Sequence, residues 1–209
     1  MPSPSSPSVA FFERQFARQI AAAEFELNPF EQAALPRLHG EVLDLGCGLG
    51  NLSIALAARG SRVSAIDASA PAVESLQRRA RALGLAVDAS RGDLRGWRPR
   101  RQWDGVACIG LLMFFAPAHA RAGLAAVRSA VRPGGVAAVN VLVEGTTYLA
   151  MFGDGPRCLF AAGEVRAAFA GWEILLDESR EFPAPDATVK RFETVIAHRP
   201  TQDLSKDSP

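Results

Sequence analysis

The sequence predicts an α/β fold, a mostly parallel sheet with helices on both faces. Val42, Leu43 and Leu45 form a short apolar run, the pattern of a strand that is buried on both faces. Glycines then fall on alternate positions from 46 to 50, and residues 51–59 follow with helical spacing. A second strand-like run, residues 61–67, leads into another helical segment. These strand–helix units indicate a doubly wound fold.

The glycine segment predicts a ligand site. A strand that feeds a glycine loop and then a helix brings bare backbone against a ligand at the helix N-terminus. The dinucleotide fingerprint G-x-G-x-x-G would need a third glycine at position 51, where this chain has Asn51. The pattern here is D-x-G-x-G-x-G, in which Asp44 lies two residues before Gly46. A tight turn that merely needs glycines is the alternative at this point.

This string resembles the first motif of class I S-adenosylmethionine-dependent methyltransferases. The resemblance implies a single-domain, Rossmann-like sheet of seven mostly parallel strands in the order 3-2-1-4-5-7-6, with S-adenosyl-L-methionine as the cofactor. In that family the glycine loop passes under the amino-acid end of the cofactor. The acid at the position of Asp44 helps to hold the methionine ammonium, often through water.

Asp67 ends the second predicted strand, 17 residues after Gly50. A carboxylate at this place in a doubly wound fold binds a ribose diol, because its two oxygens match two adjacent hydroxyls. The alternative role is a helix N-cap. Ser69 caps the next helix more naturally, with Pro71 in the first turn, so we expect Asp67 to be free for the ligand.

Later segments extend the resemblance. A third strand, 86–90, leads to Asp93 and Leu94, which match the family positions that meet the exocyclic amine and the ring of adenine. A fourth strand covers 103–109, and residues 131–140 are expected to be a helix end, a turn and a strand, with the R-P-G-G string that is frequent in this family. The predicted cofactor-binding residues are Asp44, Gly46, Cys47, Gly48, Gly50, Asp67, Ala68, Asp93, Leu94 and Ile109.

Composition excludes several classes of protein. The chain has 209 residues, 48% of them hydrophobic, which is enough for one buried core. Its net charge of +1 gives no footprint for nucleic acid or an anionic membrane. The apolar runs are shorter than the ~20 residues of a membrane span, and the N-terminus lacks the features of a signal peptide.

Three widely spaced cysteines favour a reducing cytoplasm, and no Cys or His pair has metal-ligand spacing, so no metal is expected.

The chain divides into a tail (1–8), N-terminal helices that form a lid (9–38), a methyltransferase domain (39–199) and a second tail (200–209). The helix at 9–25 is amphipathic and either packs against the sheet or closes over the cofactor. Asn28-Pro29-Phe30 looks like the N-P-P-aromatic motif of methyltransferases that act on amino groups of bases or glutamine. It precedes the first strand, however, so we interpret Asn28 as a helix N-cap.

The acceptor side is less defined. Residues 111–115 and parts of 160–194 resemble small bacterial tellurite-resistance methyltransferases. Those proteins carry a His-Arg pair after the first strand of the closing hairpin, whereas this chain has neither residue in 181–186. We expect a small-molecule acceptor, with catalytic residues unassigned. Tyr148, as a donor, and Arg157, as a site for an anion, are weak candidates that are otherwise plain loop residues. The alternatives are a protein that binds S-adenosylmethionine without catalysis and, disfavoured by the glycine spacing, an NAD(P)-dependent oxidoreductase.

Overall fold

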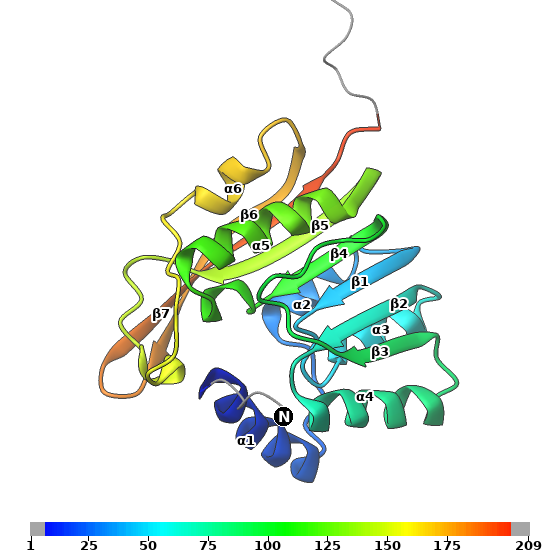
Figure 1. Ribbon diagram of the computed structural model, residues 1–209, viewed down its shortest axis with the longest axis horizontal. Helices are drawn as coiled ribbons and strands as arrows, with labels where there is room; N and C mark the ends of the chain where they lie inside the picture. The colour runs from blue at the N-terminus through cyan, green and yellow to red at the C-terminus, as the bar shows by residue number, and fades with distance from the viewer. Residues whose placement is uncertain (1–6, 202–209) are drawn as a thin grey trace, which may run out of the picture.

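The computed structural model describes residues 7–201, which form one seven-stranded sheet in the order β3-β2-β1-β4-β5-β7-β6 (Figure 1). The first five strands in this order run parallel, and β7 is antiparallel to both β5 and β6. The predicted fold class and strand order are confirmed. The strands are β1 (Glu41–Leu45), β2 (Arg62–Asp67), β3 (Val87–Arg91), β4 (Trp103–Ile109), β5 (Val131–Leu142), β6 (Glu173–Ala184) and β7 (Thr188–His198).

Helices cover both faces of the sheet. One face carries α2 (Pro29–Ala34), α3 (Asn51–Ala58) and α4 (Ala70–Ala82), whose apolar residues join one core cluster. The other face carries α5 (Pro117–Ala130) and α6 (Glu164–Ala168). No helix within residues 7–201 is both long and apolar enough to cross a membrane.

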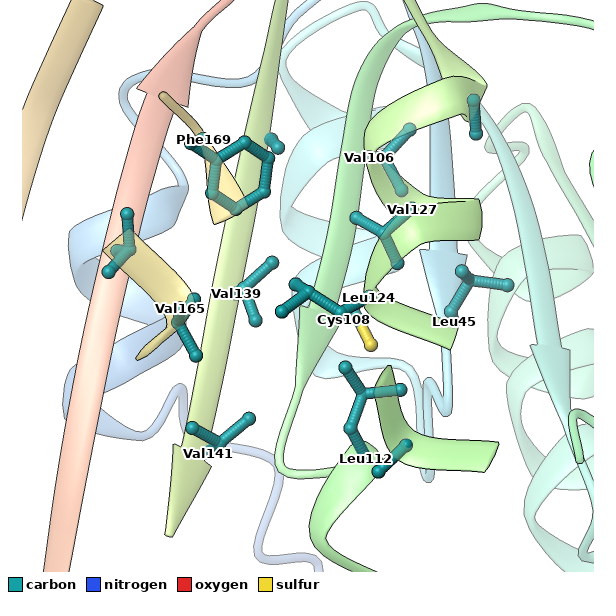
Figure 2. Packing of buried hydrophobic residues seen from close by; sticks show 14 of the residues in the cluster. Leu45, Val106, Cys108, Leu112, Leu124, Val127, Val139, Val141, Val165 and Phe169 are labelled. Carbon is teal, nitrogen blue, oxygen red and sulfur yellow. The ribbon is translucent and has the colours of Figure 1, made fainter. Parts of the chain in front are cut away.

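The core on the α5 face follows the alternation of the strands. In Figure 2, Cys108 of β4 and Val139 of β5 lie close to Leu124 and Val127 of α5. Side chains one residue away along each strand point to the opposite face, where Ala107 and Ala138 pack under α2 and α3. The central strands are therefore buried on both sides, as their continuous apolar runs predict.

Two segments differ from expectation. The R-P-G-G string is not a separate turn, because β5 already begins at Val131 and continues through it. Positions 131 and 136 of β5 pair with 103 and 105 of β4, so the string is a bulge in which extra residues loop out. The closing hairpin is also longer than predicted: β6 runs to Ala184, which puts most of residues 181–186 in the strand instead of after it.

The first helix, α1 (Pro7–Ala22), starts at Pro7, inside the range expected as a tail. It lies beyond the carboxyl ends of β1 and β2, against α4 and the 3-10 helix η2 (Ala150–Phe152) (Figure 1). The rest of the two expected tails falls mainly on residues 1–6 and 202–209, which lie outside the described residues.

Candidate active site

The glycine loop joins β1 to α3 at the carboxyl end of the sheet. Gly46, Gly48 and Gly50 all have positive φ, between 53° and 72°. The amide of Gly46 donates to the carbonyl of Ile66 at 2.8 Å, which ties the loop to β2. A Cβ on Gly50 would collide with the side chain of Leu76. The loop therefore needs glycine both for its backbone conformation and for its approach to α4.

Asp44 lies at the end of β1 beside this loop and is only 4% exposed. The Ser53 hydroxyl donates to its Oδ2 at 2.6 Å. Burial raises the pKa of Asp44 to about 6, the Ser53 hydrogen bond opposes this rise, and the nearby carboxylate of Asp67 adds to it. Because burial disfavours the ionised form of the Asp44 carboxylate, a cationic ligand beside it would be favourable.

Asp67 connects the glycine loop to the next turn. Its Oδ2 accepts from the amide of Gly48 and its Oδ1 from the amide of Ser69, both at 2.8 Å. Ser69 itself caps α4 by accepting from the amide of Ala72, as predicted. Asp67 is thus no helix cap, but it is not as free as expected, because each oxygen already accepts one backbone hydrogen bond. Each oxygen keeps a further lone pair for a ligand. Burial raises the pKa of Asp67.

The segment after β3 puts Asp93 and Leu94 in different surroundings. Asp93 is exposed and paired with Arg95, whose Nη2 lies 2.6 Å from Oδ2, and this hydrogen bond lowers the pKa of Asp93. Leu94 is buried and lines a small cavity with Trp97 from its own segment and Leu111 from the loop after β4. An apolar slot thus lies between the segments that follow β3 and β4.

The remaining predicted residues lie close to the same edge of the sheet. Cys47 is buried within the glycine loop, and burial raises the pKa of its thiol well above the usual range. Ala68 follows the last residue of β2, and Ile109 is the last residue of β4. All three cysteines are free thiols, as expected from their spacing.

The N-terminal segment covers the glycine loop. The ring of Phe16, on α1, would lie 3.1 Å from a Cβ on Gly48. The guanidinium of Arg79 stacks on the Phe25 ring at 3.8 Å and donates to the carbonyl of Leu49 at 2.8 Å. Asn51 donates to the carbonyl of Glu26 at 3.2 Å. These contacts hold the chain before β1 against the loop.

Beyond β4 and β5 an aromatic cluster joins segments that are distant in sequence. Phe12 of α1 meets Phe114 edge to face at 5.0 Å, and Phe114 meets Phe152 at 5.2 Å. Tyr148 packs against this cluster. Arg157 is exposed, and its role as a site for an anion stays a prediction, as does that of Tyr148 as a donor. The buried members of the cluster are Met113, Phe114, Leu142, Met151 and Phe152.

Two polar residues near the glycine loop were missed by the sequence analysis. Glu31 forms a capping box with Asn28 at the start of α2, which confirms Asn28 as the N-cap. Burial raises the pKa of Glu31 to about 7, and the charge of Asp44 contributes to the rise. Asn140, on β5, is 1% exposed, and its Oδ1 has no hydrogen-bond partner within the described residues. The spacing Asn28-x-x-Glu31 was a readable capping signal, but it gave no hint of the neighbouring Asp44.

Comparison with known proteins agrees with this geometry. The family described as "Methyltransferase domain" matches residues 42–135. The cypemycin N-terminal methyltransferase of a Streptomyces species is 38% identical over 99 residues, 46% of this chain and 39% of the relative. Trans-aconitate 2-methyltransferase of Rhodococcus jostii is 36% identical over 106 residues, 50% of this chain and 38% of the relative. This chain thus spans about two fifths of the length of these curated relatives. The crystal structure of TehB from Haemophilus influenzae superposes with a TM-score of 0.70 at 18% identity, covering 81% of this chain and 61% of TehB.

The strand order and the glycine loop between β1 and α3 define the class I S-adenosylmethionine-dependent methyltransferase fold. Residues 42–135 match a methyltransferase-domain family, and the architecture of the described residues is similar to that of TehB.

Proposed function

We propose that this protein transfers a methyl group from S-adenosylmethionine to a small-molecule acceptor. The observation that carries the proposal is the joining of Asp44, the glycine loop and Asp67 at the adjacent carboxyl ends of β1 and β2. The match of residues 42–135 to a methyltransferase family supports it.

Each part of the cofactor has a matching group. Asp44 is a buried carboxylate suited to the methionine ammonium, and the bare backbone of residues 46–50 admits close contact with the amino-acid end. Asp67 retains lone pairs for the ribose hydroxyls. Leu94 is a buried apolar residue next to the exposed carboxylate of Asp93, a pair that can cover the adenine ring and accept from its exocyclic amine.

Little further chemistry is required of the protein. The sulfonium of S-adenosylmethionine already activates the leaving group, and methyl transfer is an in-line displacement in which well-oriented reactants gain roughly 7–11 kcal/mol. The aromatic cluster on α1, η1 (Leu112–Phe114) and η2 supplies apolar walls that exclude water. The main contribution of this site is therefore to position the acceptor against the methyl group of the cofactor.

The acceptor is proposed to be a small molecule, not a nucleic acid, because the net charge of +1 gives no overall attraction to a polyanion. Tellurite is not favoured, because residues 181–186, mostly within β6, contain neither His nor Arg. Location in the cytoplasm stays a prediction.

Two measurements test the proposal. Isothermal calorimetry should detect binding of S-adenosylhomocysteine and no binding of NADH. Incubation with S-adenosylmethionine and panels of amines, thiols, hydroxyls and carboxylates should yield S-adenosylhomocysteine. Tight binding of NADH without binding of S-adenosylhomocysteine would identify an oxidoreductase instead. Binding of S-adenosylhomocysteine with no turnover across all four panels would favour the non-catalytic alternative.

A further inference from the structure

Asp44 and Asn140 lie on the same face of the sheet. Asp44 of β1 pairs with Ala107 of β4, and Ala107 pairs with Ala138 of β5. Paired residues point to the same side, and so does the residue two positions further along a strand. Asn140 therefore faces the same side as Asp44, two strands away, a separation of about 10 Å between strand axes.

The Asn140 side chain is oriented by β7. Its Nδ2 donates to Thr194 Oγ1 at 3.0 Å and to the carbonyl of Glu193 at 3.4 Å. Nδ2 is thus directed toward β7, and Oδ1, bonded to the same Cγ, takes no part in these contacts. This buried oxygen has no hydrogen-bond partner in the described part of the chain, which is unfavourable for a buried acceptor.

Glu31 lies over the same region of the sheet. The neighbouring Phe30 packs on Phe192 of β7 at 4.8 Å, while Glu31 is close enough to Asp44 for their charges to interact. The start of α2 therefore lies over the sheet between β1 and β7, on the face that carries Asp44 and Asn140. One oxygen of Glu31 accepts from the amide of Asn28 at 2.8 Å.

The side chains of Glu31, Asp44 and Asn140 offer hydrogen-bond acceptors to a ligand. Within residues 7–201, no Lys, Arg or His side chain hydrogen bonds or forms an ion pair with Glu31, Asp44 or Asn140. Asp44 also interacts electrostatically with the carboxylate of Asp67. An array of carboxylates and an amide oxygen matches a ligand that brings N–H donors and positive charge.

We propose that Glu31 and Asn140 form a subsite for an amino group next to the cofactor. The inference rests on the proposed function, since it presumes that the cofactor lies on the glycine loop. Two sources fit this chemistry: the amino group of an amine acceptor, which would lie at the transferred methyl, and the amino group of the cofactor's methionine part. In the first case Glu31 would accept a proton from the amine, and the freed nitrogen lone pair would form the N–CH3 bond as the S–CH3 bond breaks and S-adenosylhomocysteine leaves.

Three nucleosides distinguish the sources by calorimetry. 5′-Methylthioadenosine has no amino-acid part, S-adenosylhomocysteine has its ammonium, and sinefungin adds an amino group where the transferred methyl stands. We compare the wild type with Glu31→Gln, which keeps an acceptor for the amide of Asn28 but removes the charge, and with Asn140→Leu. Glu24→Gln, an exposed acid on the chain before β1, is the matched control.

If the subsite binds the acceptor's amine, Glu31→Gln weakens sinefungin about tenfold and leaves the other two nucleosides within about twofold. If it binds the methionine ammonium, sinefungin and S-adenosylhomocysteine weaken together and methylthioadenosine does not. Either result supports the proposal. Unchanged affinities, or an equal loss for all three ligands, overturn it. The comparison of the wild type with Glu31→Gln is enough to decide these outcomes. The test therefore does not depend on whether Asn140→Leu folds. Failure of all three nucleosides to bind the wild type would instead overturn the proposed function.

Discussion

The two halves of the site are built from different kinds of contact. In the cofactor half (residues 44–50 and 67–69) side-chain oxygens hold backbone amides, and the contact between Gly48 and Asp67 spans 19 positions. In the half where we propose that the acceptor binds (the acceptor half: α1, η1 and residues 143–160), aromatic rings contact each other, and Phe12 meets Phe114 across about a hundred positions. The first half depends on exact residue types at fixed spacing. The second depends on volume and shape, which many residue combinations can supply.

The largest expected effect lies in the acceptor half. Phe152→Ala removes a ring that is 1% exposed and should lower the free energy of unfolding by about 3–5 kcal/mol in urea denaturation. Because the ring of Phe152 packs on Phe114 in the aromatic cluster, affinity of the folded protein for S-adenosylhomocysteine should stay within about threefold. Leu83→Ala, at a site that is 61% exposed, is the control and should change stability by less than about 0.5 kcal/mol. A large loss of cofactor affinity in Phe152→Ala would contradict the division of the site into two independent halves.

Gly50→Ala tests the cofactor half through its backbone. The left-handed conformation costs a non-glycine residue about 1–2 kcal/mol, and Leu76 must also move. We expect the loss of stability to come with a fall of about tenfold or more in affinity for S-adenosylhomocysteine. The matched control is Gly60→Ala, which has φ of 92° but no atom within 4 Å of the added Cβ. Equal losses in the two variants would mean that only backbone strain matters.

Asp67→Asn tests the carboxylate that joins the loop to β2. An amide has one acceptor oxygen, so it cannot serve both Gly48 and Ser69 and also receive ribose hydroxyls. Affinity for S-adenosylhomocysteine should fall roughly 10- to 100-fold by calorimetry, the range for charged hydrogen bonds. Asp88→Asn, at an exposed position of β3, should have no effect. Unchanged affinity in Asp67→Asn would show that the ribose binds elsewhere.

The smallest predicted effect is a pH dependence at Asp44. Its pKa is about 6 in the folded protein and about 3.8 ordinarily, so between these values the native state holds a proton that the unfolded chain has released. The free energy of unfolding therefore declines as pH rises through this window. Relative to Asp44→Asn, the unliganded wild type should lose on the order of 1–2 kcal/mol between about pH 4 and pH 6.5. Chemical denaturation at each pH measures the difference.

Saturating S-adenosylhomocysteine should reduce this pH-dependent loss, because its ammonium stabilises the ionised Asp44. Glu24→Gln, which removes an exposed acid, should follow the wild type across the same range. A pH-independent difference between wild type and Asp44→Asn would contradict the raised pKa.

The contrast between the halves also explains what the sequence could predict. The glycine loop and the Ser69 cap follow from local spacing and turn chemistry, the strand order follows from the family resemblance, and the structure has all three as expected. The contacts of Phe16 with the glycine loop and of Phe12 with Phe114 depend on how α1 packs across the sheet, which no local pattern encodes. The charge interaction between Glu31 and Asp44 is of the same kind, since it is set by the position of α2 over the strands. The bulge at the start of β5 was missed because proline and glycine favour a turn as readily as a bulge.

Phe12 and Phe16 are one helical turn apart, and one rests on η1 while the other rests on the glycine loop. A helix moves as a rigid rod over such a distance, so α1 cannot lift from one contact and keep the other. Residues 23–28 join α1 to α2, and Arg79 holds this segment through the ring of Phe25. We expect any displacement of α1 to uncover the glycine loop and η1 at the same time.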